Sequence, residues 1–365
     1  MPIYMDFHDL PDSVTAKDIA EMHQADLKIE HKYNCRGLTY WCDESRRTAF
    51  CLIEAPNKEA IKELHEKSHG AVPQRIIEVN DTLVESFLGR IEDPENLENT
   101  KLNIIKDSAF RILMIVYLKK NVLRTKNIST LQAAIRGYKK SIINIVNEQH
   151  GRIVKQESNS FLMSFTSSTN AIKSAIEIEK LYNCVITPDI EFKIGINAGN
   201  PITNKESLFE EAIKKAEYLT YITNGKIIIS PEVKEQYEFE NQNNPINIKG
   251  VKPLDSNEMK FITQLIEYNE NVWTNSEISA IDYNKNLGLS KSKLYRIMMP
   301  IIGKSPNGFI KEFRLNKALE LLDKKTLNIS EIAFQTGFSS PTYFSKCFYE
   351  TYGILPSEYI KLLLT

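Results

Sequence analysis

The spacing of hydrophobic residues changes twice along the chain and divides it into three parts. In the first part, residues 1–82, short apolar stretches predict strands at 2–8, 37–43, 48–54 and 74–80. Apolar residues that recur every three or four positions predict helices at 15–32 and 57–69. The resulting order, βαββαβ, is that of a ferredoxin-like fold.

The second part, residues 108–240, mixes strands with helices. Apolar runs predict strands at 111–118 and 190–197, two strands within 150–165, and a β-branched strand at 226–230. Helical spacing is found at 129–148, 168–182 and 206–222. This mixture predicts an α/β sandwich within a multidomain α+β protein. The acidic stretch 83–107 and the polar stretch 241–267 are expected to be linkers.

The third part, residues 268–365, is predicted to be all-α and contains an internal repeat. The first copy contains Gly288, Leu289, Ser290 and Tyr295. The same or similar residues recur 49 positions later as Gly337, Phe338, Ser339 and Phe344. Each copy predicts a helix, a turn at the glycine and a second helix after a serine, which is the helix-turn-helix plan. Between them, Phe309–Asp323 predicts a long helix that holds two recognition helices apart, about 34 Å for successive major grooves.

The second copy, Ile329–Ile360, resembles the AraC/XylS family of transcription regulators. The residues that carry the resemblance are Ala333, Gly337, Phe338, Tyr343, Phe344, Phe348, Gly353, Pro356 and Tyr359. The resemblance implies that Ser290–Met299 and Ser340–Phe348 are recognition helices and that the aromatic residues are core. The first copy departs from the pattern because Asn284 stands where the second copy has Ala333.

Polar residues of the two recognition helices are the candidate DNA-contacting residues: Lys291, Lys293, Arg296, Ser340, Thr342, Ser345 and Lys346. Arginine and lysine favour the guanine edge, whereas serine and threonine accept several bases. Contacts to phosphate, or no contact at all with the side chains simply solvated, are the alternatives.

Composition and charge narrow the class of protein. Of 365 residues, 42% are hydrophobic and 25% are charged, which excludes wholesale disorder. The net charge of −1 combines an acidic surplus in residues 1–108 with a modest basic surplus after them. The longest apolar run, Ile112–Leu118, is too short to span a bilayer, and the N-terminus lacks the features of a secretory signal. With 5 cysteines and no CxxC spacing, we expect a cytoplasmic protein without a membrane partner.

The second part resembles the class III nucleotide cyclase homology domain, through the segments 150–165, 192–201 and 212–230. That family holds two metal ions with two aspartates, one on the first strand and one in a hairpin turn. Here the hairpin position is Asn159, and the chain has no acidic residue between Asp107 and Glu148. Because hard cations need anionic oxygen ligands, we expect a domain that is not an enzyme. Dimerisation, giving a homodimer, is the favoured role, and binding of a nucleotide-like ligand is the alternative.

Histidines crowd the first part, which holds five of the 6 in the chain. His65 and His69 are four residues apart on a predicted helix, so both rings lie on one face and can share a metal. The segment resembles small nickel-binding ferredoxin-like proteins through residues 1–11, 23–41, 50–60 and 65–70. The resemblance implies a metal site with His8, His65, His69 and, fourth in order, His23. Imidazole suits nickel and other divalent transition metals alike.

Other roles for the first part stay open. Cys51 is expected to be a buried hydrophobe, and Tyr40 and Trp41 are expected to pack in the core. The histidines could instead cap helices and pack in an interaction domain, or the domain could hold a small-molecule pocket.

The leading hypothesis is a one-component, sequence-specific DNA-binding transcription regulator. Its partners would be double-stranded DNA, a small-molecule or metal effector, and a second copy of the chain. A nucleotide cyclase is a disfavoured alternative because both metal aspartates are absent. A metal-binding storage protein with an incidental DNA domain is the third hypothesis.

Overall fold

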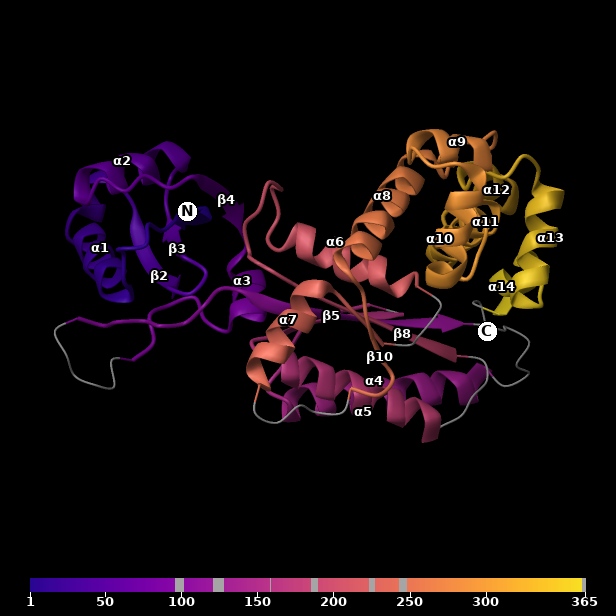
Figure 1. Cartoon of the computed structure of the whole chain (residues 1–365), viewed down its shortest axis with the longest axis horizontal. Helices are drawn as coiled ribbons and strands as arrows, with labels where there is room; N and C mark the ends of the chain where they lie inside the picture. Colours follow the sequence, from indigo (N-terminus) through magenta and orange to yellow (C-terminus); the bar gives the residue numbers. More distant parts are fainter. Residues whose placement is uncertain are drawn as a thin grey trace.

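The computed structural model describes residues 1–95, 102–120, 128–157, 159–184, 190–222, 227–242 and 248–362. Three domains follow one another along the long axis of the molecule, with the N-terminal domain at one end and an all-helical domain at the other (Figure 1). Within these ranges, none of the helices is long and apolar enough to cross a membrane.

The N-terminal domain is ferredoxin-like, as the sequence predicts. Its elements are β1 (Ile3–Asp9), α1 (Ala16–Ile29), a short 3-10 helix (Glu30–Tyr33), β2 (Arg36–Asp43), β3 (Thr48–Glu54), α2 (Lys58–Ser68) and β4 (Arg75–Val79). The strands form an antiparallel sheet in the order β2-β3-β1-β4. Side-chain caps start both helices, because Thr15 accepts from the Asp18 N–H and Asn57 from the Ala60 N–H.

Both faces of this sheet are buried within the chain. One face packs under α1 and α2 through residues such as Tyr4, Tyr40 and Ile53. The opposite face, which includes Trp41 and Phe50, packs against α3 (Asp81–Leu88) and against the central domain. The expected linker 83–107 therefore begins inside a helix that joins two domains. Its other end runs beside β2, where the Cys42 N–H donates to the Asp107 carbonyl at 3.0 Å.

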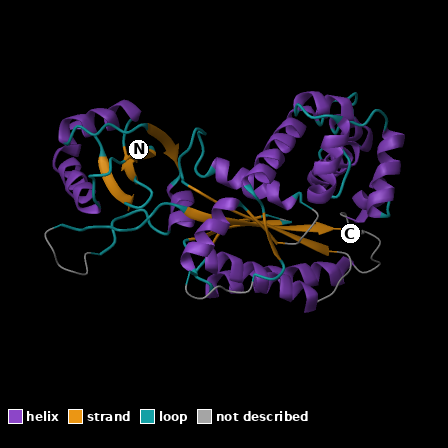
Figure 2. Ribbon diagram, in the orientation of Figure 1, coloured by secondary structure: helices purple, strands orange, loops and turns teal. Residues whose placement is uncertain are grey.

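The central domain is the mixed α/β domain that the sequence predicts. Its elements are β5 (Arg111–Lys120), α4 (Ile128–Glu148), β6 (Arg152–Gln156), β7 (Ser160–Phe165), α5 (Ser168–Cys184), β8 (Ile190–Gly199), α6 (Glu210–Thr220), β9 (Ile227–Ile229), α7 (Pro231–Glu240) and β10 (Val251–Pro253). The sheet order is β10-β9-β8-β5-β7-β6. Helices α4, α5 and α7 cover one face, and α6 crosses the other (Figures 1 and 2).

Helix α6 lies unusually close to the sheet. A Cβ atom at Gly195 of β8 would stand 2.1 Å from the Ala216 carbonyl oxygen of α6, so only glycine fits there. Asn197, on the same face of β8, donates from Nδ2 to the Ala212 carbonyl at 3.1 Å. The N-terminal end of α6 packs into the core shared with the N-terminal domain, and Leu219 near its C-terminal end packs into the core of the helical domain. One helix therefore contacts both neighbours.

The C-terminal domain is helical and begins earlier than the sequence suggests. Its helices are α8 (Ser256–Val272), α9 (Ala280–Asn286), α10 (Lys291–Ile302), α11 (Pro306–Lys324), α12 (Ile329–Gln335), α13 (Pro341–Tyr352) and α14 (Pro356–Leu362). Part of the expected linker 241–267 is thus strand β10, which extends the central sheet, and the first two-thirds of α8. Buried Phe261, Ile262 and Leu265 hold that part of α8 in the core, and this burial is the reason it is not a linker.

Two helix-turn-helix units lie on either side of α11, which confirms the internal repeat. Helices α9 and α10 form the first unit and turn at Gly288, whereas α12 and α13 form the second and turn at Gly337. Both glycines have positive φ, +64° and +74°, a conformation that favours glycine. Ser290 and Ser340 cap α10 and α13.

One expectation about the second unit is wrong. Phe344, Phe348 and Tyr359 are core residues as expected, but Tyr343 is 50% exposed. Helix α13 presents Phe344, Cys347 and Phe348 to the core, and Tyr343, one turn before Cys347, lies at the edge of that face. Its ring touches the core only at the edge, 6.0 Å from the ring of Phe338.

Candidate metal centre and nucleic-acid interface

A buried network of histidine and aspartate lies under the helices of the N-terminal domain. His65 of α2 is at its centre, 1% exposed. Its Nε2 is 2.9 Å from Oδ2 of Asp6 on β1, and its Nδ1 is 3.2 Å from Oδ2 of Asp26 on α1. Three elements far apart in the sequence thus bring their polar side chains to one imidazole.

His69 extends the network toward the surface. It follows α2 and stands four residues after His65, so the two rings share a face, with His65 Nδ1 2.9 Å from His69 Nε2. The same Nε2 atom is 3.3 Å from the Asp26 carboxylate. Ser68 fixes that carboxylate by donating to its Oδ1 at 2.5 Å. One ligand atom each from Asp26, His65 and His69 lies within 4.8 Å of the others, the spacing of a metal site.

A second group of three stands on the neighbouring strands. His8 Nε2 is 3.2 Å from Oδ1 of Asp6, two residues earlier on β1. Cys51 on β3 is paired directly opposite Asp6, and its N–H donates to the same oxygen at 3.1 Å. Asp6, His8 and Cys51 also offer ligand atoms within 4.8 Å of one another. Because Asp6 contacts both His8 and His65, the two groups adjoin.

Charge in this network is stabilised by mutual contact. Burial alone would raise the pKa of Asp6, but the imidazoles of His8 and His65 hold the pKa of that carboxyl well below its usual range. Burial would likewise lower the pKa of His65, but Asp6 and Asp26 raise it to about 10. Burial raises the pKa of the Cys51 thiol. A bound cation would take over from protons the task of pairing with these carboxylates.

The donor set fits a divalent transition metal. Imidazole nitrogen with carboxylate oxygen suits nickel, zinc and copper, and a thiol adds a softer donor at the second group. His8, His65 and His69, all predicted from the sequence, lie in this network. Three of their partners, Asp6, Asp26 and Cys51, were not predicted as ligands. Asp6 shares a strand face with His8 at a spacing of two, which was an available signal.

His23 belongs to neither group within the part of the chain that the structure describes. Its Nε2 is 3.3 Å from Oδ2 of Asp93, a residue of the segment after α3, and its ring centroid is 5.1 Å from that of Tyr40. His23 is buried, and its contacts with Asp93 and Tyr40 hold the imidazole in place. The structure thus brings together three of the four predicted histidines.

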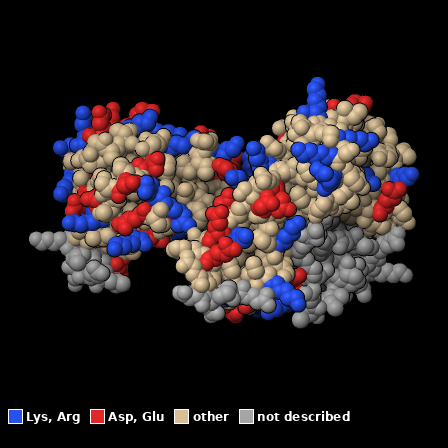
Figure 3. All heavy atoms as spheres, in the orientation of Figure 1, with Lys and Arg blue, Asp and Glu red and all other residues tan. Residues whose placement is uncertain are grey.

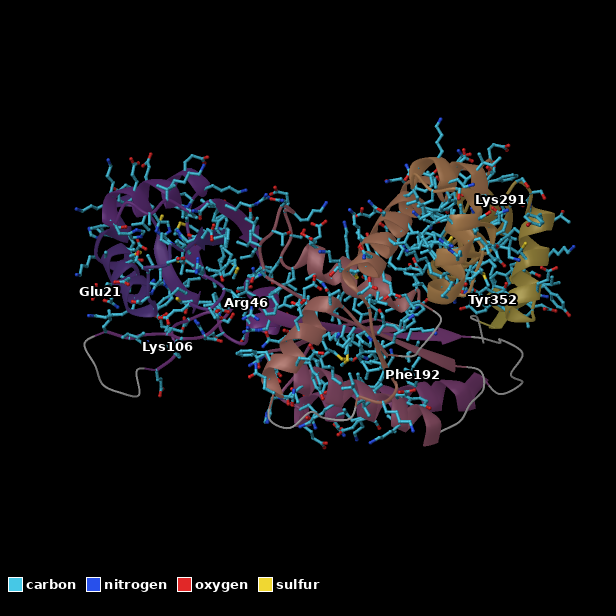
Figure 4. The ribbon with its side chains drawn as sticks, viewed as in Figure 1. Glu21, Arg46, Lys106, Phe192, Lys291 and Tyr352 are labelled. Carbon is cyan, nitrogen blue, oxygen red and sulfur yellow. The ribbon has the colours of Figure 1, made fainter. Side chains whose placement is uncertain are left out.

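The first recognition helix carries three exposed cations. Lys291, Lys293 and Arg296 of α10 are all exposed, and Figure 4 labels Lys291 in the helical domain. Lysine and arginine side chains also gather on the face of this domain that Figure 3 shows. The helix that enters the groove in a helix-turn-helix unit therefore presents positive charge here.

The second recognition helix has a different surface. Thr342 and Lys346 of α13 are exposed, whereas Ser345 is half-buried and Ser340 uses its hydroxyl to accept from the Tyr343 N–H at 3.2 Å. Two exposed tyrosines of this helix, Tyr343 and Tyr349, were not predicted as candidates. The periodicity of α13, with core residues at 344, 347 and 348, could have shown that positions 343 and 349 lie outside the core.

The two positions at which the cyclase resemblance implies metal aspartates carry no carboxylate, since β5 has no acidic residue and the hairpin position is Asn159. Asn159 follows β6, and its carbonyl accepts from the Leu118 N–H at 2.7 Å, which brings it to the end of β5. Beside it, Tyr117 pairs with Ser160, and burial raises the pKa of Tyr117 to about 12. A cleft of about 1500 Å³ separates these residues from Lys317 and Glu320 of α11.

Comparison with known proteins assigns the two end domains. Residues 4–79 match the family described as nickel responsive protein SCO4226-like, and residues 283–361 match a helix-turn-helix domain family. The chain is 25% identical over 297 residues to Histidine kinase P4 of Formosa agariphila, covering 74% of this chain and 21% of that protein. It is 31% identical over 100 residues to HTH-type transcriptional regulator MtrA of Neisseria gonorrhoeae, covering 27% of this chain and 32% of that protein.

Solved structures are also similar to parts of the chain, and one of them covers about a fifth of it. It is SCO4226 from Streptomyces coelicolor A3(2), 34% identical, covering 21% of this chain and 94% of that one with a TM-score of 0.20. The chain spans between about a fifth and a third of the length of the two curated relatives above. Its C-terminal domain is an AraC-type helix-turn-helix domain, and its N-terminal domain is SCO4226-like.

Proposed function

We propose that this chain is a sequence-specific DNA-binding transcription regulator whose N-terminal domain senses a divalent transition metal. The observation that carries the proposal is the pair of helix-turn-helix units, whose second helices α10 and α13 both present polar residues to solvent. Lys291, Lys293 and Arg296 would contact DNA through the first unit, and Thr342 and Lys346 through the second.

Nickel is the metal we propose for the N-terminal domain, at the group of Asp26, His65 and His69. The proposal is supported by the match to a nickel-responsive family and by three buried or half-buried donors within 4.8 Å. Neutral imidazole nitrogens of His65 and His69 would hold the metal ion, which would supply positive charge opposite the buried carboxylates. Asp26 would supply a carboxylate oxygen to the same ion, with Ser68 holding that carboxylate, and Asp6 would orient the His65 ring through Nε2.

Helix α6 is the proposed connection between metal and DNA. Its two ends pack into the cores shared with the N-terminal and helical domains. A change in the N-terminal sheet that moves α6 along β8 would reposition α8 and the first helix-turn-helix unit. For the metal to regulate DNA binding, it must bind the two arrangements with different affinity.

The central domain serves, in this proposal, as a connector without catalytic activity. The absence of acidic residues on β5 and the neutral side chain of Asn159 support it, since two-metal chemistry needs carboxylates. Formation of cyclic nucleotide from ATP or GTP with manganese by the purified chain would contradict this role.

A homodimer is also part of the proposal. The sheet of the N-terminal domain already has both faces covered within the chain, so pairing would use another surface, and the central domain is the candidate. Sedimentation equilibrium should give twice the mass of one chain. A single-chain mass at micromolar concentration would contradict dimerisation.

DNA binding is tested with the full chain on random duplexes. Repeated selection should enrich one sequence motif, and binding to it should weaken steeply with salt because phosphate contacts release counterions. The variant Arg296→Ala should lose selectivity at one position, whereas Lys361→Ala, on α14 outside both recognition helices, should bind like the native chain. Enrichment of no motif would contradict the proposal.

Metal binding is tested by calorimetry with nickel. The double variant His65→Ala/His69→Ala should lose stoichiometric binding, because both imidazole donors of the proposed site are gone. His31→Ala removes an exposed histidine of the same domain and is the matched control, with binding unchanged. Equal nickel affinity in the double variant and the control would contradict the assignment.

A further inference from the structure

Arg314 lies at the midpoint of α11 and is almost completely buried, with 9% of its surface exposed. Its Nε donates to the Trp273 carbonyl at 2.7 Å, and its Nη2 donates to the Asn275 carbonyl at 2.6 Å. A charged donor makes stronger hydrogen bonds than a neutral one, and the planar guanidinium fixes the direction of both.

The two carbonyls belong to the segment that leads from α8 into the first helix-turn-helix unit. Trp273 caps α8, and its N–H donates to the Asn269 carbonyl at 2.9 Å. Seven residues later, α9 begins at Ala280. Arg314 therefore ties the entrance of the first unit to the middle of the long helix.

The turn of the second unit contacts the same segment. A Cβ atom at Gly337 would stand 2.3 Å from the Trp273 carbonyl oxygen and 2.9 Å from Nε of Arg314. Trp273, Arg314 and the turn at Gly337 thus form one junction. The segment that enters the first unit binds the guanidinium through its carbonyls, and the turn of the second unit packs against both the guanidinium and the Trp273 carbonyl.

This junction adds a constraint that α11 alone does not provide. Phe309 and Ile310 of α11 pack in the first core, whereas Leu315 and Ala318 pack in the second. A helix shared in this way fixes the distance between two units. A second contact away from the helix axis also fixes their relative rotation.

We propose that Arg314 is a positioning residue that sets the relative rotation and spacing of recognition helices α10 and α13, and so selects the separation of DNA half-sites. The proposal rests on the DNA-binding function above. On B-DNA, each added base pair rotates the next half-site by about 35°, because one turn takes about 10.5 base pairs. A rigid pair of helices discriminates between such spacings, whereas a loose pair tolerates them.

The first test measures the geometry without DNA. Cysteines placed at the exposed positions Ser292 of α10 and Thr342 of α13 carry spin labels in the full chain, and pulsed electron paramagnetic resonance gives their distance distribution. The native chain should give a narrow distribution, and Arg314→Met should at least double its width. Lys324→Met removes a charge from the exposed end of the same helix and should leave the width unchanged.

Arg314→Lys keeps the charge and guards against a misfolded methionine variant. An ammonium group cannot reproduce the two fixed hydrogen bonds, so its distribution should also broaden, though less. An unchanged width in either folded variant would overturn the proposal.

The second test measures half-site spacing. Duplexes that carry the selected half-sites are lengthened or shortened by one or two base pairs between them. The native chain should prefer one spacing by about tenfold, since other spacings force the DNA to twist, and Arg314→Met should prefer it by less than about threefold with the same preferred bases. Equal spacing preference in both would overturn the proposal. If selection yields no motif, DNA binding fails while the spin-label distances still decide the role of Arg314.

Discussion

The two helix-turn-helix units share a plan but are held in the molecule in different ways. The core of the first unit includes Tyr218, Leu219 and Ile228 of the central domain, together with α8, α10 and the start of α11. The core of the second unit is made of residues between 315 and 360. The first unit is therefore oriented by the central domain, and the second by α11 and the junction at Arg314.

The turns of the two units also differ in how closely other parts of the chain pack against them. Gly288 is exposed, and a Cβ atom there would meet no heavy atom of the described residues within 4 Å beyond its chain neighbours. Gly337 is buried against the Trp273 carbonyl. In the first unit, Asn284 replaces the small Ala333 of the second, and its half-buried Oδ1 has no hydrogen-bond partner among the described residues. Equivalent positions in a repeat thus meet different demands.

The largest expected effect is on the two turn glycines. Gly337→Ala should lower the free energy of unfolding by about 3 kcal/mol or more, because a left-handed backbone and a clash with backbone add together. Gly288→Ala meets only the backbone cost and should lose about 1 kcal/mol. Denaturant unfolding of both variants measures the difference. Equal losses of unfolding free energy would contradict the difference in packing between the two turns.

The recognition helices should differ in their dependence on salt. Replacing Lys291, Lys293 and Arg296 together by alanine removes three cations from α10 and should flatten the slope of log affinity against log salt by about 2 to 3. Lys346→Ala removes one cation from α13 and should flatten it by about 1. Fluorescence anisotropy between 50 and 200 mM salt, about the range in which phosphate contacts change affinity most, measures both slopes. Identical slopes would mean that the two helices contribute the same charge.

The contact with the central domain should matter for the first unit alone. Tyr221 stacks on Phe313 with ring centroids 5.7 Å apart and meets Phe309 at 6.2 Å. Tyr221→Leu should cost about 1 kcal/mol, the usual worth of such aromatic pairs. Hydrogen exchange should rise in α9 and α10 and stay constant in α12 and α13. A rise spread equally over both units would contradict their different attachment.

The smallest effect concerns pH and the first helix of the first unit. Ser279 and Asp282 form a capping box at α9, and their hydrogen bonds lower the pKa of Asp282. The carboxylate of Asp282 therefore stabilises α9 fully at pH values above about 4, the pKa of this group in the unfolded chain. This contribution is lost as the pH falls from there through the lower pKa of the folded state. Asp282→Asn should remove this acid dependence from unfolding curves measured between about pH 5 and pH 2. The same acid loss in Asp282→Asn and the native chain would contradict it.

Much of the fold could be predicted from local sequence patterns. The strand and helix order of residues 1–82 follows from periodicity, and the repeat around Gly288 and Gly337 follows from turn residues at a constant offset. Polar elements that are stabilised by packing against distant parts of the chain were not predicted. Most of α3 and the first two-thirds of α8 were expected to be linkers because their partners, such as Phe209 for α3 and Leu294 for α8, come from distant parts of the sequence.

The histidines of the candidate metal site show the same division. His65 and His69 are related by helix spacing, which is local and visible in the sequence. Asp6 and Cys51 face each other through the register of β1 and β3, and Asp26 reaches His65 from another helix. Those relations depend on how the elements pack, and helix spacing or strand alternation alone does not contain them.

The central claim is that metal in the N-terminal domain changes DNA binding by the C-terminal domain. The most direct measurement titrates a selected, labelled duplex with the metal-free and the nickel-loaded full chain, beside the variant His65→Ala/His69→Ala. We predict that nickel changes the dissociation constant of the native chain by about fivefold or more, and that the variant does not respond. Sequence-selective binding that is the same with and without nickel, or an equal response of the variant, would contradict the account.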